Sequence, residues 1–110
     1  MVGTVSTDLG VPARDEIELV ELLQAFADPI RLYLIRVLDD ADGELSCKEI
    51  PLPVTKSTAS HHYKVLREAG ALDVRVDGTR RYYRLRRADL EARFPGLLDS
   101  VLSGAERTSV

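Results

Sequence analysis

The sequence contains few of the residues that build disulfides and metal centres. Among its 110 residues there is one cysteine, Cys47, and there are two histidines, which are adjacent at positions 61 and 62. A single thiol cannot form an internal disulfide and does not make a metal site by itself. We therefore expect no metal site and no cofactor, and we interpret Cys47 as a small, semi-buried residue. The alternative is a reactive thiol sensor beside Lys48.

Long apolar runs are also missing. No stretch approaches the roughly 20 apolar residues that a membrane-spanning helix needs, and the N-terminus lacks the charged and then apolar segments of an export signal. We expect a cytoplasmic protein that makes no membrane contact. The sequence has no Gly-rich phosphate loop and no paired acids in a plausible cleft, and its one cysteine and two histidines suggest no nucleophilic site, so it predicts no enzyme.

Acidic and basic residues are distributed unevenly along a chain whose net charge is −3. Residues 1–55 carry four Lys and Arg against eleven acids, whereas residues 56–93 carry ten against five and have a net charge of +5. The local positive field attracts phosphate more than the overall balance does. Residues 56–93 are therefore the candidate for nucleic-acid contact.

The length suits one domain. We expect a mobile arm, a folded domain for DNA binding and dimerisation, and a frayed tail, over residues 1–14, 15–104 and 105–110. The domain is expected to open with a helix at Asp15, whose acidic first turn complements the helix dipole. A broad apolar stripe from Ile17 to Phe26 favours burial on two sides, against the domain and against a second subunit. Simple core packing is the alternative.

Two further helix starts follow from capping patterns. Asp28 is a suitable N-cap and Pro29 a suitable first helical residue, so a second helix is expected to start there, with Arg31 in solvent. Ser46 and Glu49 have the spacing of a capping box, which predicts a short third helix.

Residues 55–70 predict an amphipathic helix that is capped by Thr55 or Ser57 and ended by Gly70. One face is apolar, and the other is small, polar and basic, which allows close approach to base edges and phosphates. A short helix, a tight turn and a polar-faced helix form a helix-turn-helix. The residues of this helix expected to contact DNA are Lys56, Ser57, Thr58, Ser60, His61 and Lys64.

After Gly70 the hydrophobic period changes to two. Residues 72–76 and 79–86 predict a two-stranded wing, with Asp77 and Gly78 forming a type I′ turn. Its tip and outer face are expected to carry Arg75, Arg80, Arg81, Tyr82, Arg84 and Arg86. Arginines beside a helix-turn-helix can follow phosphates or enter the minor groove. The wing residues expected to contact DNA are Arg75, Arg80, Arg81 and Tyr82.

The last segment, residues 88–104, predicts a helical turn, a break at Pro95 and a second short helix. No later segment covers its apolar stripe, so we expect the stripe to form a dimer surface together with the first helix. The residues expected in that surface are Ile17, Val20, Leu23, Leu90, Leu97, Leu98, Val101 and Leu102.

The order of these elements is that of a winged helix-turn-helix, a mainly α fold with a small β-hairpin. Three blocks, ADPIRL at 27–32, STASHHYKVLREAG at 57–70 and GTRRYYRL at 78–85, also resemble the ArsR-type family of small bacterial transcriptional regulators. The resemblance implies a homodimer that binds a palindromic operator in double-stranded DNA, usually as a repressor. It also implies release of the DNA by an inducer, here a small molecule of unidentified chemistry.

The sequence departs from that family at two places. Metal-sensing members have a Cys-Val-Cys type motif where residues 44–50 have one thiol, and no histidine lies beyond position 62, so we expect no metal sensing. His61 stands where the family often has Arg. Because an imidazole is largely neutral at pH 7, we expect operator affinity to rise in mildly acidic solution if His61 meets a phosphate or a guanine edge. We interpret His62 as a packing or capping residue on the inner side.

Two functions therefore fit the sequence. The first is a DNA-binding repressor that reads the major groove with residues 57–69 and the backbone or minor groove with residues 72–86. The second is a winged-helix module that binds another protein and not DNA. The arginine-rich wing argues against the second, because protein interfaces do not need five arginines on one hairpin.

Overall fold

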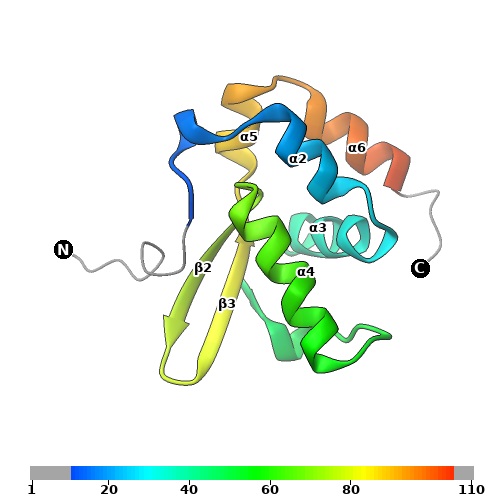
Figure 1. The fold of residues 1–110 in the computed structure, drawn as a ribbon, viewed down its shortest axis with the longest axis vertical. Helices are drawn as coiled ribbons and strands as arrows, with labels where there is room; N and C mark the ends of the chain where they lie inside the picture. Colours follow the sequence, from blue (N-terminus) through cyan, green and yellow to red (C-terminus); the bar gives the residue numbers. More distant parts are fainter. Residues whose placement is uncertain (1–10, 106–110) are drawn as a thin grey trace.

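The computed structural model describes residues 11–105. Five α-helices, two 3₁₀ turns and three short strands make up this part of the chain (Figure 1). They are η1 (Arg14–Glu16), α2 (Leu19–Phe26), α3 (Pro29–Ala41), β1 (Leu45–Ser46), η2 (Cys47–Glu49), α4 (Lys56–Glu68), β2 (Leu72–Asp77), β3 (Arg80–Leu85), α5 (Arg87–Arg93) and α6 (Leu97–Ala105). This is the predicted winged helix-turn-helix. No helix in residues 11–105 is long and apolar enough to cross a membrane.

The hairpin of β2 and β3 extends from one end of the molecule, and α2, α5 and α6 lie at the other end (Figure 1). Between them, α3 packs against α2, α4, α6 and β3. Its inner face contributes three fully buried side chains, Leu34, Ile35 and Leu38. The core therefore joins the helical end to the base of the wing.

The first helix begins later than the sequence predicts. Residues 14–16 form only a 3₁₀ turn, and the α-helix starts at Leu19. Ile17 between them is 1% exposed, and its carbonyl accepts a hydrogen bond from Arg93 on α5. The predicted start at Asp15 is wrong because burial of Ile17 and its contact with α5 hold the chain extended there.

Residues 11–14 are also held in place, although the sequence places them in a mobile arm whose residues 1–10 lie outside the described range. Arg86 donates to the carbonyl of Pro12 at 2.7 Å and to Asp89 at 2.8 Å. Arg14 donates to the same Asp89 carboxylate at 2.7 Å. Burial of Asp89 opposes ionisation, but these hydrogen bonds outweigh it and lower the pKa of Asp89. The predicted tail lies outside the described range except for Ala105, which ends α6.

Helix α3 starts as predicted. Asp28 Oδ1 accepts hydrogen bonds from the amides of Ile30, at 2.8 Å, and Arg31, at 3.1 Å, and Pro29 occupies the first helical position. The sequence predicted that Arg31 extends into solvent, and this prediction is wrong. Its guanidinium is partly buried and donates from Nε to the carbonyl of Ala25 at 2.6 Å. This arginine therefore ties the end of α2 to the start of α3.

The sheet has three strands, one more than predicted, in the order β1-β3-β2. Leu45 and Ser46 pair with Tyr83 and Tyr82 of β3. Asp77 pairs with Arg80, so the hairpin loop consists of residues 78 and 79 instead of 77 and 78. Only the first loop residue, a glycine with φ of 64°, has positive φ. That is the pattern of a type II′ turn, and the predicted type I′ turn is wrong.

Candidate nucleic-acid interface

Helix α4 is capped by Thr55, whose hydroxyl accepts from the Thr58 amide at 3.2 Å. At the other end, the Gly70 amide donates to Arg67 and the Ala71 amide donates to Leu66. These two hydrogen bonds form a Schellman motif, in which Gly70 adopts φ of 94°. Local sequence chemistry thus ends the helix where the sequence predicted.

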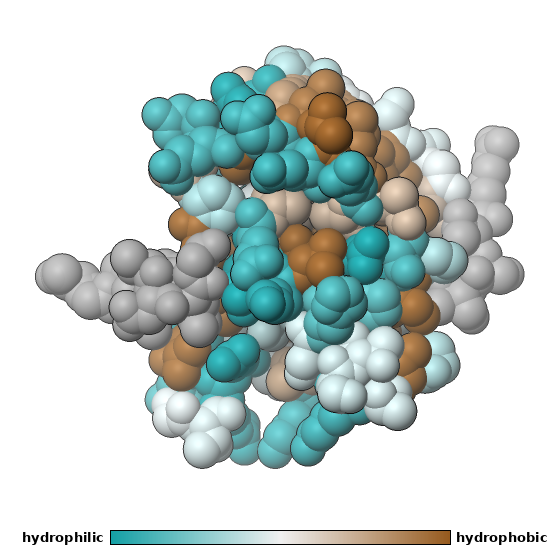
Figure 2. All heavy atoms as spheres, viewed as in Figure 1, coloured by the Kyte–Doolittle hydropathy of each residue, from teal (hydrophilic) through white to brown (hydrophobic). Residues whose placement is uncertain are grey.

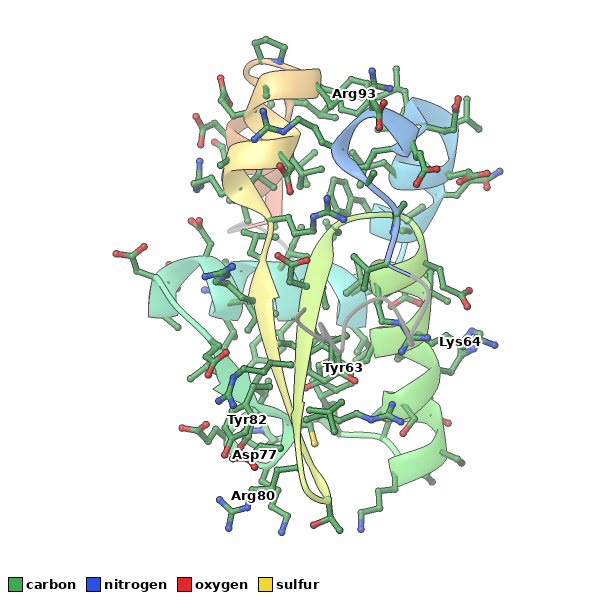
Figure 3. All side chains as sticks on the ribbon, turned by 90° about the vertical axis from the view of Figure 1, so that its left-hand side faces the viewer. Tyr63, Lys64, Asp77, Arg80, Tyr82 and Arg93 are labelled. Carbon is green, nitrogen blue, oxygen red and sulfur yellow. The ribbon has the colours of Figure 1, made fainter. Side chains whose placement is uncertain are left out.

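The polar face of α4 is open to solvent. All six residues of α4 that were predicted to contact DNA are exposed, and Lys64 projects outward from the helix (Figure 3). Three of these side chains are short hydroxyls, so the helix surface can approach another molecule closely. The six are Lys56, Ser57, Thr58, Ser60, His61 and Lys64.

The inner face of α4 holds the helix against the core. Tyr63 stacks on Tyr83 of the wing, with ring centroids 4.3 Å apart and planes 19° from parallel. His62 is 7% exposed, and its Nδ1 lies 3.1 Å from Nη1 of Arg31. The prediction that His62 packs inward is confirmed. These two contacts fix how α4 is placed relative to both the wing and α3.

Arg80 and Arg81 are the free cations of the wing. Both are exposed, and within residues 11–105 neither forms an ion pair. Arg80 lies at the tip of the hairpin (Figure 3). Both guanidinium groups are therefore available to a polyanion.

Arg75 is already engaged by the protein. Its Nη2 lies 2.6 Å from Oε1 of Glu44, its Nε bonds the same carboxylate, and its guanidinium lies 4.4 Å from the ring centre of Tyr82. The hydrogen bond from Arg75 lowers the pKa of Glu44. Contact between Arg75 and DNA would have to break this bidentate pair.

Two other arginines, expected on the outer face of the wing, also have internal partners. Arg84 lies 3.6 Å from Asp73, and the side chain of Arg86 is only 5% exposed between Asp73 and Asp89. The excess of arginine in this hairpin thus serves partly to join β3 to β2 and α5. The prediction that Arg86 lies on the outer face is wrong.

The first turn of α4 and the tip of the wing lie at the same end of the molecule (Figures 1 and 3). Lys48 in η2 and Thr79 in the hairpin loop border the same cavity as Lys56 and Arg81. Neither residue was predicted to contact DNA. Lys48 had a signal, because it is one of only four basic residues in the acidic first half of the chain.

Cys47 is exposed, which corrects the expectation of a semi-buried residue. Within the part of the chain that the structure describes, no three His, Cys, Asp or Glu side chains come together in a group that could hold a metal ion.

The apolar surface lies at the end opposite the wing tip. Leu19, Val20 and Leu23 of α2 are 42%, 65% and 44% exposed, and Figure 2 shows hydrophobic surface over this helix. Leu97 and Val101 of α6 are half-buried. The other residues of the predicted dimer surface pack inside the monomer and leave almost no area for a second subunit, which corrects that part of the prediction. They are Ile17, Leu90, Leu98 and Leu102.

No protein-family model matches the chain. Among curated proteins it is 37% identical over 83 residues to the uncharacterized HTH-type transcriptional regulator YceK of Bacillus subtilis, a match that covers 74% of this chain and 83% of that protein. It is also 37% identical over 82 residues to the biofilm growth-associated repressor of Agrobacterium fabrum, covering 71% of this chain and 68% of the repressor.

Two solved structures have a similar fold. A possible transcriptional regulatory protein from Mycobacterium bovis, solved as fragment 1–100, superposes with a TM-score of 0.62 at 30% identity, over 77% of this chain and 90% of that one. A possible transcriptional regulator for arsenical resistance superposes with a TM-score of 0.59 at 34% identity, over 84% of this chain and 100% of that one. Each superposition therefore covers more than three-quarters of this chain.

Proposed function

The chain belongs to the HTH-type transcriptional regulators, and we propose that it is an ArsR-type repressor that binds a palindromic operator as a homodimer. In this proposal α4 enters the major groove. Ser57, Ser60 and His61 meet base edges, while Lys56 and Lys64 contact phosphates. Arg80 and Arg81 at the wing follow the neighbouring backbone or enter the minor groove.

One observation carries the proposal. The exposed polar face of α4 and the two unpaired wing arginines lie at the same end of the molecule, while the apolar surface of α2 lies at the other (Figures 1 and 3). DNA and a second subunit would therefore occupy different ends and would not compete. The charge also agrees, because residues 56–93, with a net charge of +5, contain α4 and the wing.

A dimer is supported by the exposed face of α2. Val20 is 65% exposed, and its neighbours Leu19 and Leu23 are each more than two-fifths exposed. Covering three large apolar side chains that lie along one helix favours association through the hydrophobic effect. A two-fold dimer would present two α4 helices to half-sites about 34 Å apart, which is one turn of DNA.

The test is selection of bound fragments from a genomic library, followed by fluorescence anisotropy on the selected duplex at several salt concentrations. We expect one palindromic site and an affinity that falls steeply as salt rises, because phosphate contacts release counterions. The proposal fails if no fragment shows salt-sensitive binding. Capture of a protein partner by a chain that binds no DNA would instead support the protein-interaction alternative.

A further inference from the structure

A cavity of about 480 Å³ lies between η2, the first two turns of α4 and the tip of the wing. Figure 2 shows the surface hollowed between the wing tip and the start of α4. The volume lies within the range of roughly 300 to 1,000 Å³ that is usual for small-molecule sites. Its walls come from all three elements of the proposed DNA-binding unit, so a molecule inside it would touch each of them.

Part of the cavity lining is apolar and part of it is aromatic. Ile50, Leu52, Val54 and Ala59 contribute aliphatic surface, and the stacked rings of Tyr63 and Tyr83 add an aromatic one. Within residues 11–105, the Tyr63 hydroxyl is buried and has no hydrogen-bond partner. Burial, with Cys47 and Tyr83 nearby, raises the pKa of Tyr63, so this hydroxyl stays protonated and can donate.

The charged residues around the cavity all have the same sign. Lys48, Lys56 and Arg81 line it, and among the described residues that line it there is no acid. All three are exposed, so their charges can reach a ligand at the mouth of the cavity. A ligand that complements this site would have an apolar, flat body and a negative charge at one end.

We propose that this cavity binds a small organic anion, a fused or single aromatic ring with one carboxylate, and that the bound anion opposes DNA binding. The claim that the anion opposes DNA binding rests on the proposed function, because Lys56, Ser60 and Arg81 are also proposed DNA contacts. A ligand on these side chains takes cations away from phosphate and occupies the space between α4 and the wing. The coupling is reciprocal, so bound DNA must lower the affinity for the ligand by the same factor.

Binding is tested by NMR titration of the ¹⁵N-labelled full chain with 2-naphthoate and with 2-naphthamide, which has the same ring and no charge. We expect 2-naphthoate to shift amides near Lys48, Ser60 and Thr79, and 2-naphthamide to bind about tenfold more weakly. Lys48→Gln should lower the affinity for 2-naphthoate about threefold and leave the affinity for 2-naphthamide unchanged. Arg36→Gln removes a cation on α3 outside the cavity, so it should change the affinity for neither compound.

The second arm adds 2-naphthoate to the protein on its selected duplex and measures anisotropy. We expect saturating 2-naphthoate to weaken DNA binding at least about tenfold, because two cations, Lys56 and Arg81, are shared with DNA, and we expect 2-naphthamide at the same concentration to have little effect. Shifts that cluster at Leu19, Val20 and Leu23 instead, or equal binding of both compounds, would overturn the site. If 2-naphthoate binds at Lys48 but no duplex binds at all, the site stands and the proposed function fails. If the duplex binds and millimolar 2-naphthoate causes no shifts, the inference alone fails.

Discussion

Nη1 of Arg31, in the first turn of α3, lies 3.1 Å from Nδ1 of His62, on the inner face of α4. A guanidinium can only donate, so this contact requires a lone pair on Nδ1 and hence a neutral imidazole with its proton on Nε2. Asp28, the N-cap of α3, lies 4.0 Å from the same Nδ1. Protonation of this buried imidazole would therefore remove a contact that joins α4 to α3.

Stability should fall in mild acid because of His62. Burial, with Arg31 and His61 adding to it and Asp28 opposing it, lowers the pKa of His62 below its ordinary value of 6.5. The unfolded chain then binds more protons than the folded one, and folding free energy is lost as pH falls below about 6.5. Thermal unfolding from pH 7 to pH 5 should show this slope in the wild type and a weaker one in His62→Gln.

The matched control is His61→Gln, which removes the exposed neighbouring imidazole but leaves His62 buried beside Arg31, so it should keep most of the wild-type slope. Glu44 and Asp89 do not interfere, because their pKa values are lowered and their contributions are lost only at more acidic pH. Equal slopes for wild type and His62→Gln would show that the Arg31 contact does not depend on charge.

The two kinds of wing arginine should respond differently to substitution. Arg80→Gln removes an unpaired cation at the tip and should lower the slope of log affinity against log salt by about 1. Arg75→Gln should change it less, because Glu44 already holds that guanidinium at 2.6 Å. Anisotropy titrations on one duplex at several salt concentrations measure both. An equal change for the two variants would mean that the Glu44 pair opens in the complex.

Local signals in the sequence predicted the structure well where the structure depends on adjacent residues. Asp28 with Pro29, Thr55, and Gly70 each set a helix end through their own side-chain or backbone chemistry, and each end lies where expected. The exposed face of α4 followed from periodicity in the same way. These features need no knowledge of distant partners.

Apart from the type of the hairpin turn, most of the errors involve contacts between residues far apart in the chain. Arg75 meets Glu44 across 31 positions, and Ile17 is held by Arg93 across 76. Strand β1 exists only because β3 offers it an edge, and its two residues carry no periodicity of their own. Composition shows how many arginines a wing has, but only the fold shows which of them remain unpaired.

Gly70 should tolerate no side chain. Its φ is 94°, and a Cβ there would lie 2.6 Å from Cγ1 of the buried Ile17. Gly70→Ala should therefore cost about 1–3 kcal/mol of unfolding free energy, measured by urea denaturation. Gly104→Ala in α6 is the control, because a Cβ there meets nothing within 4 Å and should stabilise the helix by about 0.5–1 kcal/mol. A Gly70→Ala variant as stable as the wild type would contradict the steric argument.

Two exposed residues of α4 should separate affinity from specificity. Lys64→Ala removes a charge and should weaken binding to every duplex while lowering the salt slope by about 1. Ser60→Ala removes only a short hydroxyl and should reduce discrimination among operator variants, with the salt slope unchanged. Competition binding with single-base variants of the selected site measures both effects. A uniform loss for Ser60→Ala would place that hydroxyl on a phosphate.

Val20 should control subunit association without affecting the fold. It is 65% exposed on α2 and does not belong to the core, so a polar replacement leaves the monomer intact. Val20→Glu would place a charge in each half of a two-fold interface, where the symmetry brings two like charges together and desolvates both. Sedimentation should show a monomer, and affinity for the palindrome should fall at least about tenfold while single half-site binding persists.

Val20→Leu, which keeps the apolar surface, should remain dimeric. A Val20→Glu variant that still sediments as a dimer would place the interface away from α2, and α6, with its half-buried Leu97 and Val101, would then be the next surface to change.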